Sequence, residues 1–200
     1  MISRLAISKP HPLPIVLKYN DIRSYIFTGV FAISSVTLPR VFHQFHLAGP
    51  TFLPMHIFVL TAGLLFGGRA GLIVGLLTPL TSYAISGMPA PAILPQIIIE
   101  LSVYGLAAGI LRERFHLRPV WSLLGAMAAG RLALYLAALV IHQLAGSANS
   151  PLGLEANPFL VVGSAIKQGW PGIVIQLSFV PVAIWLTGKL TARTLRDRTH

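Results

Sequence analysis

The 200-residue sequence contains no cysteine and very little charge. The missing thiols exclude disulfide bridges, a cysteine nucleophile and thiolate metal ligands. Only 10% of the residues are charged, whereas soluble domains carry about 25%. Hydrophobic residues make up 54% of the chain, and its mean hydropathy is +0.75. This composition indicates an integral membrane protein rather than a soluble domain with a large core.

Acidic residues are especially scarce, with 5 Asp and Glu against 15 Lys and Arg, for a net charge of +10. The basic residues gather at the ends of apolar runs and are not interleaved with aromatic residues, as they are on nucleic-acid surfaces. We therefore expect this chain to contact a lipid bilayer and no nucleic acid. The sequence has no phosphate loop, catalytic triad or metal-hydrolase motif, so we expect neither enzymatic activity nor a cofactor.

Six apolar runs are candidates for transmembrane helices, which need about 20 residues. They cover residues 25–42, 55–66, 70–86, 93–111, 120–144 and 172–188. The second and third runs are short, and the Gly-Gly-Arg turn at 67–69 predicts a helical hairpin within the bundle. Residues 159–168 are separated from the sixth run by Trp-Pro-Gly at 170–172, which predicts a short surface or re-entrant helix. The predicted fold class is all-α, an integral membrane bundle of six transmembrane helices.

The distribution of Lys and Arg predicts the orientation of the bundle. With the N-terminus inside, the outer segments hold only Arg40 and Lys167, and the inner segments hold nearly all other basic residues. Both termini are therefore predicted to be cytoplasmic, and the protein is predicted to be a multi-pass protein of the cell membrane. Residues 1–24 form a predicted cytoplasmic tail, 25–188 the membrane domain, and 189–200 a basic cytoplasmic tail. Three prolines interrupt the N-terminal segment, which argues against a cleavable signal peptide.

Two charges lie inside the apolar runs. Glu100 and Arg131 each lie about 17 Å from the inner ends of neighbouring antiparallel spans, at about 1.5 Å per residue, so they reach similar depth. An isolated charge in hydrocarbon is costly, whereas a paired or hydrated charge costs much less. We expect both side chains to face the bundle interior and to pair directly or through ligand or water. Two interpretations stay open: a pair that only fixes the fold, or a direct ligand contact.

Polar side chains accompany this pair at helical spacing. Gln96, Glu100 and Tyr104 lie on one face of the fourth span, and Arg131 and Tyr135 share a face of the fifth. These groups either line a cavity that opens outward or form ordinary hydrogen bonds between helices. The predicted ligand-binding residues are His56, Gln96, Glu100, Tyr104, Arg131, Tyr135, Trp170 and Gln176.

Three histidines, His43, His46 and His56, lie in or next to the loop before the second span. No carboxylate or thiolate is close to them in the sequence, so we predict no metal site. A neutral His56 at the mouth of the second span is suited to exchange hydrogen bonds with a small polar ligand.

Small residues also recur at helical spacing. Thr28, Ala32 and Ser35 form one ridge on the first span, and glycines at 63, 67, 71 and 75 form another along the hairpin. Such ridges allow close helix packing, either within the chain or against a partner.

Several segments together resemble the substrate-binding S components of energy-coupling factor (ECF) vitamin transporters. They are PMH-I at 54–57, GMP at 87–89, E-x-x-x-YG at 100–105, GR at 130–131 and PGI-x-IQ at 171–176, within a match over about residues 25–186. The resemblance implies a six-helix membrane fold with cytoplasmic termini. It also implies a vitamin-sized ligand near the outer face, held by the last three helices and the loops. The implied partners are a transmembrane coupling (T) subunit and two cytoplasmic ATPase subunits.

The resemblance bears on two further features. The first helix of S components offers an Ala-x-x-x-Ala contact to the coupling subunit, and Thr28 and Ala32 are the nearest equivalent here, so they are the expected partner contacts. Related cobalt and nickel S components bind metal through an N-terminal Met-His and the free amine. Met55 and His56 are internal in this chain, so that metal site cannot form.

The leading hypothesis is a high-affinity substrate-binding subunit of an ECF-type ABC transporter that imports a small water-soluble vitamin or vitamin precursor. Arg131 would suit a carboxylate-bearing ligand such as niacin or pantothenate, whereas a fully closed pair with Glu100 would suit a neutral ligand equally well. The alternatives are a stand-alone ion-coupled secondary transporter of a small polar solute and a non-transporting membrane scaffold. Internal repeats would favour the secondary transporter, and the sequence shows no convincing repeat.

Overall fold

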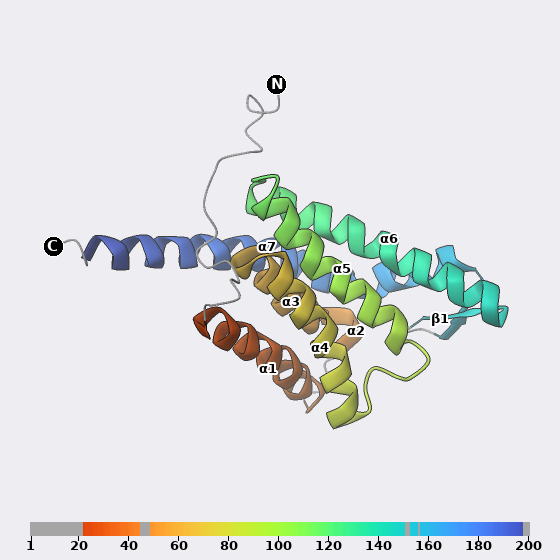
Figure 1. The fold of residues 1–200 in the computed structure, drawn as a ribbon. Coiled ribbons are helices and arrows are strands. Elements are labelled where there is room, and N and C mark those ends of the chain that lie inside the picture. Colours follow the sequence, from red (N-terminus) through yellow and green to blue (C-terminus); the bar gives the residue numbers. More distant parts are fainter. Residues whose placement is uncertain (1–21, 45–48, 151–152, 156, 198–200) are drawn as a thin grey trace, which may run out of the picture.

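The computed structural model describes residues 22–44, 49–150, 153–155 and 157–197, and these residues form helices and one short hairpin (Figure 1). The elements are α1 (Ile22–Gln44), α2 (Gly49–Phe52), α3 (Pro54–Phe66), α4 (Gly68–Ser86), α5 (Leu94–Glu113), α6 (Pro119–Ala145), β1 (Ala148–Ser150), β2 (Gly153–Glu155) and α7 (Pro158–Asp197). The predicted helical bundle is confirmed. The predicted N-terminal tail lies outside the described residues up to residue 21.

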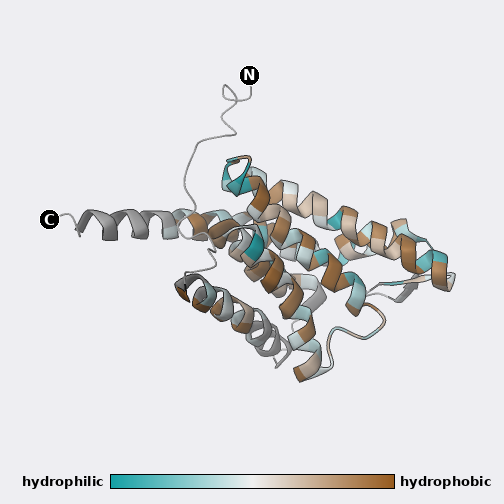
Figure 2. Ribbon diagram, viewed as in Figure 1, coloured by the Kyte–Doolittle hydropathy of each residue, from teal (hydrophilic) through white to brown (hydrophobic). Residues whose placement is uncertain are grey.

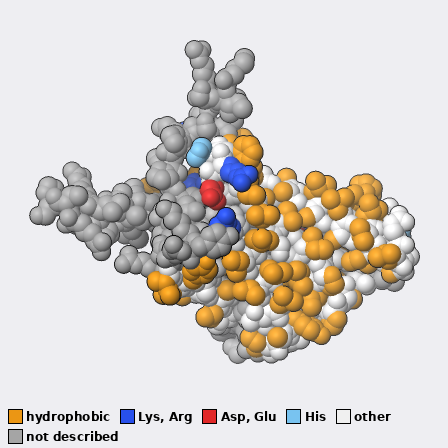
Figure 3. Space-filling model, in the orientation of Figure 1, with side chains coloured by type: hydrophobic (Ala, Val, Ile, Leu, Met, Phe, Trp, Pro, Cys, Tyr) orange, Lys and Arg blue, Asp and Glu red, His pale blue; other side chains and the backbone are white. Residues whose placement is uncertain are grey.

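The outside of the bundle is apolar. Hydrophobic residues run along the helices, and hydrophobic side chains are spread over the visible described surface (Figures 2 and 3). Among the described residues, three helical segments are long and apolar enough to cross a membrane: Leu94–Glu113, Pro119–Ala145 and Pro158–Thr187. Helix α3 is apolar but has only 13 residues. The chain is thus built as a membrane protein, while the number of six spans and the orientation stay predictions.

Helices α3 and α4 form the predicted hairpin around Gly67. This residue has a φ of 94°, a conformation that favours glycine. Its N–H donates to the carbonyl oxygen of Gly63 at 3.0 Å, and its own carbonyl accepts from the N–H of Gly71 at 3.1 Å. The chain therefore reverses direction between two helices with a single residue outside them.

Glycine ridges bring this hairpin against α5. A Cβ added to Gly71 would collide with the backbone of Gly105, and a Cβ added to Gly105 would collide with that of Gly71. A Cβ added to Gly75 would likewise collide with the backbone of Leu101. A Cβ added to Gly63 would collide with the backbone of Gly105. The predicted ridge thus acts within the chain, and it places α5 at the centre of the bundle in contact with α3, α4 and α6 (Figure 1).

The last apolar region contradicts the sequence prediction. Helix α7 runs without interruption from Pro158 to Asp197, so the predicted division at 170–172 is wrong, and the helix continues through residues 189–197. A proline inside a helix removes one hydrogen bond and kinks the helix, but it does not end it where neighbouring helices support both sides. Gly169 and Gly172 supply that support here, because they pack directly against Leu53 and Phe52 respectively.

The segment between α6 and α7 also differs from the expected loop. Strands β1 and β2 pair antiparallel, with Ala148 opposite Glu155 and Ser150 opposite Gly153. Ala148 is buried in one apolar cluster with Leu134 and Val161, so the hairpin fills the space between α6 and α7. The all-α prediction omitted this hairpin because its turn-forming residues also suit an irregular loop.

Candidate ligand-binding site

The buried charges meet where α3, α5 and α6 converge. Glu100 and Tyr104 are one helical turn apart on α5, and both are buried. Gly130 on α6 packs against the Tyr104 ring, and a Cβ at this position would overlap the ring atoms. Because Gly130 has no side chain, α6 approaches α5 closely enough for the adjacent Arg131 to reach Glu100.

Glu100 and Arg131 form a direct ion pair. The Nη1 of Arg131 donates to the Oε1 of Glu100 at 2.7 Å, and the two side chains are only 13% and 5% exposed respectively. The predicted common depth is therefore confirmed. The second terminal nitrogen of Arg131, Nη2, is buried and has no hydrogen-bond partner among the described residues.

His56 faces the same carboxylate from α3. Its Nε2 lies 3.9 Å from the Oε1 of Glu100, and its ring meets the Tyr104 ring edge-on at a centroid distance of 5.2 Å. His56 is buried, and neither ring nitrogen has a hydrogen-bond partner within the described part of the chain. Glu100 thus has one close basic partner, Arg131, and a second base just beyond hydrogen-bond distance.

Two buried glutamines extend this polar layer. Gln96 lies one turn before Glu100 on α5, and Gln176 lies on α7. Gly172, one turn before Gln176, packs against Leu53, whose carbonyl oxygen accepts from the N–H of His56 at 3.1 Å. This contact holds α7 against the start of α3, one turn before Gln176 and three residues before His56.

Three side-chain nitrogens of these buried residues are unpaired hydrogen-bond donors. The Nε2 atoms of Gln96 and Gln176 and the Nη2 of Arg131 are all donors, and all lack a partner among the described residues. Buried polar groups are normally paired, and each one left unpaired costs about 1–3 kcal/mol. These unpaired donors make the buried polar residues a candidate site for acceptor atoms of a small molecule.

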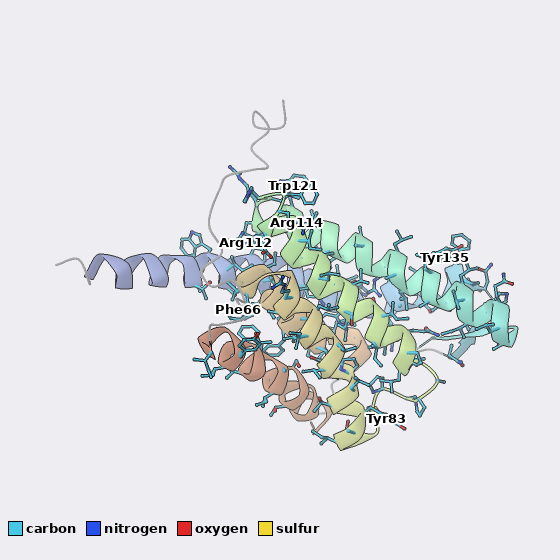
Figure 4. The ribbon with its side chains drawn as sticks, in the orientation of Figure 1. Phe66, Tyr83, Arg112, Arg114, Trp121 and Tyr135 are labelled. Carbon is cyan, nitrogen blue, oxygen red and sulfur yellow. The ribbon has the colours of Figure 1, made fainter. Side chains whose placement is uncertain are left out.

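The remaining predicted ligand contacts lie apart from this layer. Tyr135 packs its ring against that of Phe159 at a centroid distance of 4.7 Å, and Figure 4 places it toward the end of α6 away from Trp121. Trp170 is 61% exposed on α7. The structure thus brings His56, Glu100, Tyr104 and Arg131 into direct contact, and it does not bring Tyr135 or Trp170 to them.

Sequence reasoning missed Gln168 as a candidate polar residue. Its Oε1 is a buried acceptor without a partner in the described structure, two helical turns before Gln176 on α7. In an unbroken helix the eight-residue spacing puts the two glutamines about 80° apart around the axis, on neighbouring parts of the helix surface. The predicted division at 170–172 separates the two residues into different helices, whereas α7 is continuous.

The predicted partner contacts and the predicted lack of a metal site stay predictions. Thr28 is buried, Ala32 is half-buried, and the exposed face of α1 carries Ile26, Val30 and Ile33 instead. No group of three His, Cys, Asp or Glu residues that could hold a metal ion occurs among the described residues. His46 lies outside the described residues.

Buried ionic and polar groups that converge between apolar helices are typical of membrane proteins with a functional polar interior. The model of one family matches this chain over residues 23–184, and that family is the substrate-specific component of ECF transporters. The chain therefore belongs to the ECF transporter substrate-specific components. No curated protein and no solved structure matched it. Membership confirms the resemblance found in the sequence and assigns the chain the substrate-binding role among the subunits of an ECF transporter.

Proposed function

We propose that this chain is the high-affinity binding subunit for a small water-soluble vitamin or vitamin precursor in an ECF-type ABC transporter. The observation that carries the proposal is the buried cluster of His56, Glu100, Tyr104 and Arg131 in a member of this family. The ligand binds from outside, and the bundle presents it inward when docked on a transmembrane coupling subunit. Two cytoplasmic ATPase subunits supply the energy, and this chain has no enzymatic activity or cofactor of its own.

The proposed ligand adds to the ion pair rather than breaking it. Arginine has five N–H donors, and the contact with Glu100 leaves Nη2 of Arg131 unpaired. A ligand carboxylate or carbonyl oxygen accepts a hydrogen bond from Nη2. Further acceptor atoms of the ligand accept hydrogen bonds from the side-chain amides of Gln96 and Gln176. Carboxylate-bearing precursors such as niacin and pantothenate fit this donor set, and so does a neutral molecule with several carbonyl oxygens.

Mass spectrometry of small molecules released from the purified protein identifies the ligand. The affinity of that ligand is then compared between the wild type and Arg131→Ala. We expect the variant to lose at least about tenfold, because a hydrogen bond to a charged group contributes about 1.5–3 kcal/mol. Lys167→Gln is the control, because Lys167 is exposed and unconnected to the cluster. Wild-type affinity in Arg131→Ala would show that Arg131 does not bind the ligand directly.

Transport by the protein alone separates the proposal from its main rival. Proteoliposomes that contain only this chain should bind the ligand without accumulating it when an ion gradient is imposed. Accumulation driven by the gradient would instead identify a stand-alone secondary transporter. Ligand-induced thermal stabilisation should also be seen, which a scaffold protein without a ligand site would not show.

A further inference from the structure

A second buried arginine, Arg112, has no counter-ion in the described structure. It lies near the end of α5 and is only 7% exposed. Its Nε is buried without a hydrogen-bond partner, and no carboxylate of the described residues pairs with its guanidinium. Arg131 is also largely buried but has Glu100 beside it. A largely buried guanidinium without a counter-ion is unfavourable, which favours an anion from outside these residues as its partner.

The N-terminus of α4 lies beside Arg112 and adds to the positive potential. Gly109, three residues before Arg112, packs against the backbone of Gly67 and Gly68. The next residue, Glu113, accepts from the N–H of Gly68 through its Oε2, but at the long distance of 3.4 Å. The first N–H groups of a helix attract anions. Arg112 and the start of α4 thus converge on one electropositive position, which Glu113 only partly neutralises.

The surface around this position has the composition of a membrane interface. The exposed residues Arg114 and His116 and the half-buried Arg118 belong to the same turn between α5 and α6. Trp121 is 48% exposed and Phe115 is 62% exposed. Charged side chains gather near this end of the molecule, and Arg112, Arg114 and Trp121 lie together there (Figures 3 and 4). Basic residues flanked by exposed aromatic rings are typical of the level of lipid headgroups.

We propose that Arg112 and the N-terminus of α4 bind the phosphate of an anionic phospholipid headgroup. The guanidinium and a phosphate match each other in charge and in bidentate geometry. Arg114 and Arg118 add attraction at the rim, and Trp121 and Phe115 lie among the headgroups. The occupied leaflet is the one that holds the α5–α6 turn, which is the cytoplasmic leaflet in the predicted orientation. The proposal does not depend on the identity of the transported substrate.

Thermal unfolding of the delipidated protein in detergent tests this site with defined lipids. Phosphatidylglycerol should raise the Tm of the wild type well above the value in phosphatidylcholine. Arg112→Gln should lose most of that gain and at least about tenfold in apparent lipid affinity, while Lys167→Gln at the other end of the bundle should keep both. Native mass spectrometry of the same samples should show fewer retained phosphatidylglycerol molecules on Arg112→Gln.

Removal of the internal carboxylate gives an opposite and independent readout. Glu113→Gln should bind phosphatidylglycerol more tightly than the wild type, because a competing negative charge is lost. In phosphatidylcholine, Arg112→Gln should be at least as stable as the wild type, which shows that it folds. The proposal is overturned if Arg112→Gln keeps the full response to phosphatidylglycerol or if phosphatidylcholine is equally effective. It is also overturned if inorganic phosphate alone reproduces the stabilisation, because the site would then serve a free anion.

Discussion

Glu100 is the residue on which the polar cluster depends. Its Oε1 lies 2.7 Å from Arg131 Nη1 and 3.9 Å from His56 Nε2. The carboxylate therefore neutralises Arg131 and holds its guanidinium in one position, with the second terminal nitrogen unpaired. Glu100 thus has a structural role whether or not it touches the ligand, and the two interpretations of the pair are compatible with each other.

Loss of Glu100 should destabilise the fold through Arg131. Glu100→Gln leaves a buried guanidinium without its counter-ion, and we expect a loss of about 3–5 kcal/mol in unfolding free energy. The double variant Glu100→Gln/Arg131→Gln removes both charges and should recover most of that loss. Thermal unfolding of the three proteins in one detergent measures the effect. A single variant as stable as the wild type would show that the pair contributes nothing to the fold.

At the scale of elements, contacts between backbones position the site. Glycines on α3 and α4 fit against the backbone of α5, and Gly130 on α6 fits against Tyr104. These contacts determine how far each helix slides along its neighbour. The register of α5 against α3 and α6 in turn decides whether His56, Glu100 and Arg131 meet.

A methyl group at the α4–α5 contact should disrupt this register. In Gly105→Ala the new Cβ overlaps the backbone of Gly71, so the helices must separate, at a cost of about 1–3 kcal/mol. Gly163→Ala is the matched control on α7, because nothing lies within 4 Å of its added Cβ. The control should be neutral or slightly stabilised, since alanine is the better helix former. Equal Tm values for the two variants would contradict the close packing of α4 on α5.

The sequence predicted those parts of the molecule that depend on local spacing. Apolar runs located the helices, and distances along the chain placed Glu100 and Arg131 at one depth. The proline in the Trp-Pro-Gly segment was misleading because its effect depends on tertiary support, which Leu53 and Phe52 provide to α7. The approach of His56 to Glu100 was not predictable in detail, because α3 and α5 are not adjacent in sequence and no periodicity fixes their relative register.

At the scale of the whole molecule, the absence of cysteine makes the orientation directly measurable. Ala92 is exposed in the α4–α5 connection, and Arg114 is exposed in the α5–α6 turn. A membrane-impermeant maleimide should label Ala92→Cys in intact cells but should label Arg114→Cys only after permeabilisation. The expectation rests on the excess of Lys and Arg in the predicted inner segments. The reverse labelling pattern would show that the bundle has the opposite orientation, with the proposed lipid site in the outer leaflet.

The most direct measurement is the affinity of the co-purified ligand for the double variant Glu100→Gln/Arg131→Gln, by calorimetric titration in detergent. This variant removes the unpaired Nη2 donor without leaving a buried charge, so fold and ligand contact are separated. If the cluster binds the substrate, the folded double variant should lose at least about tenfold in affinity, and Lys167→Gln should lose none. Wild-type affinity in the folded double variant would show that the pair only fixes the fold and that the substrate is bound elsewhere.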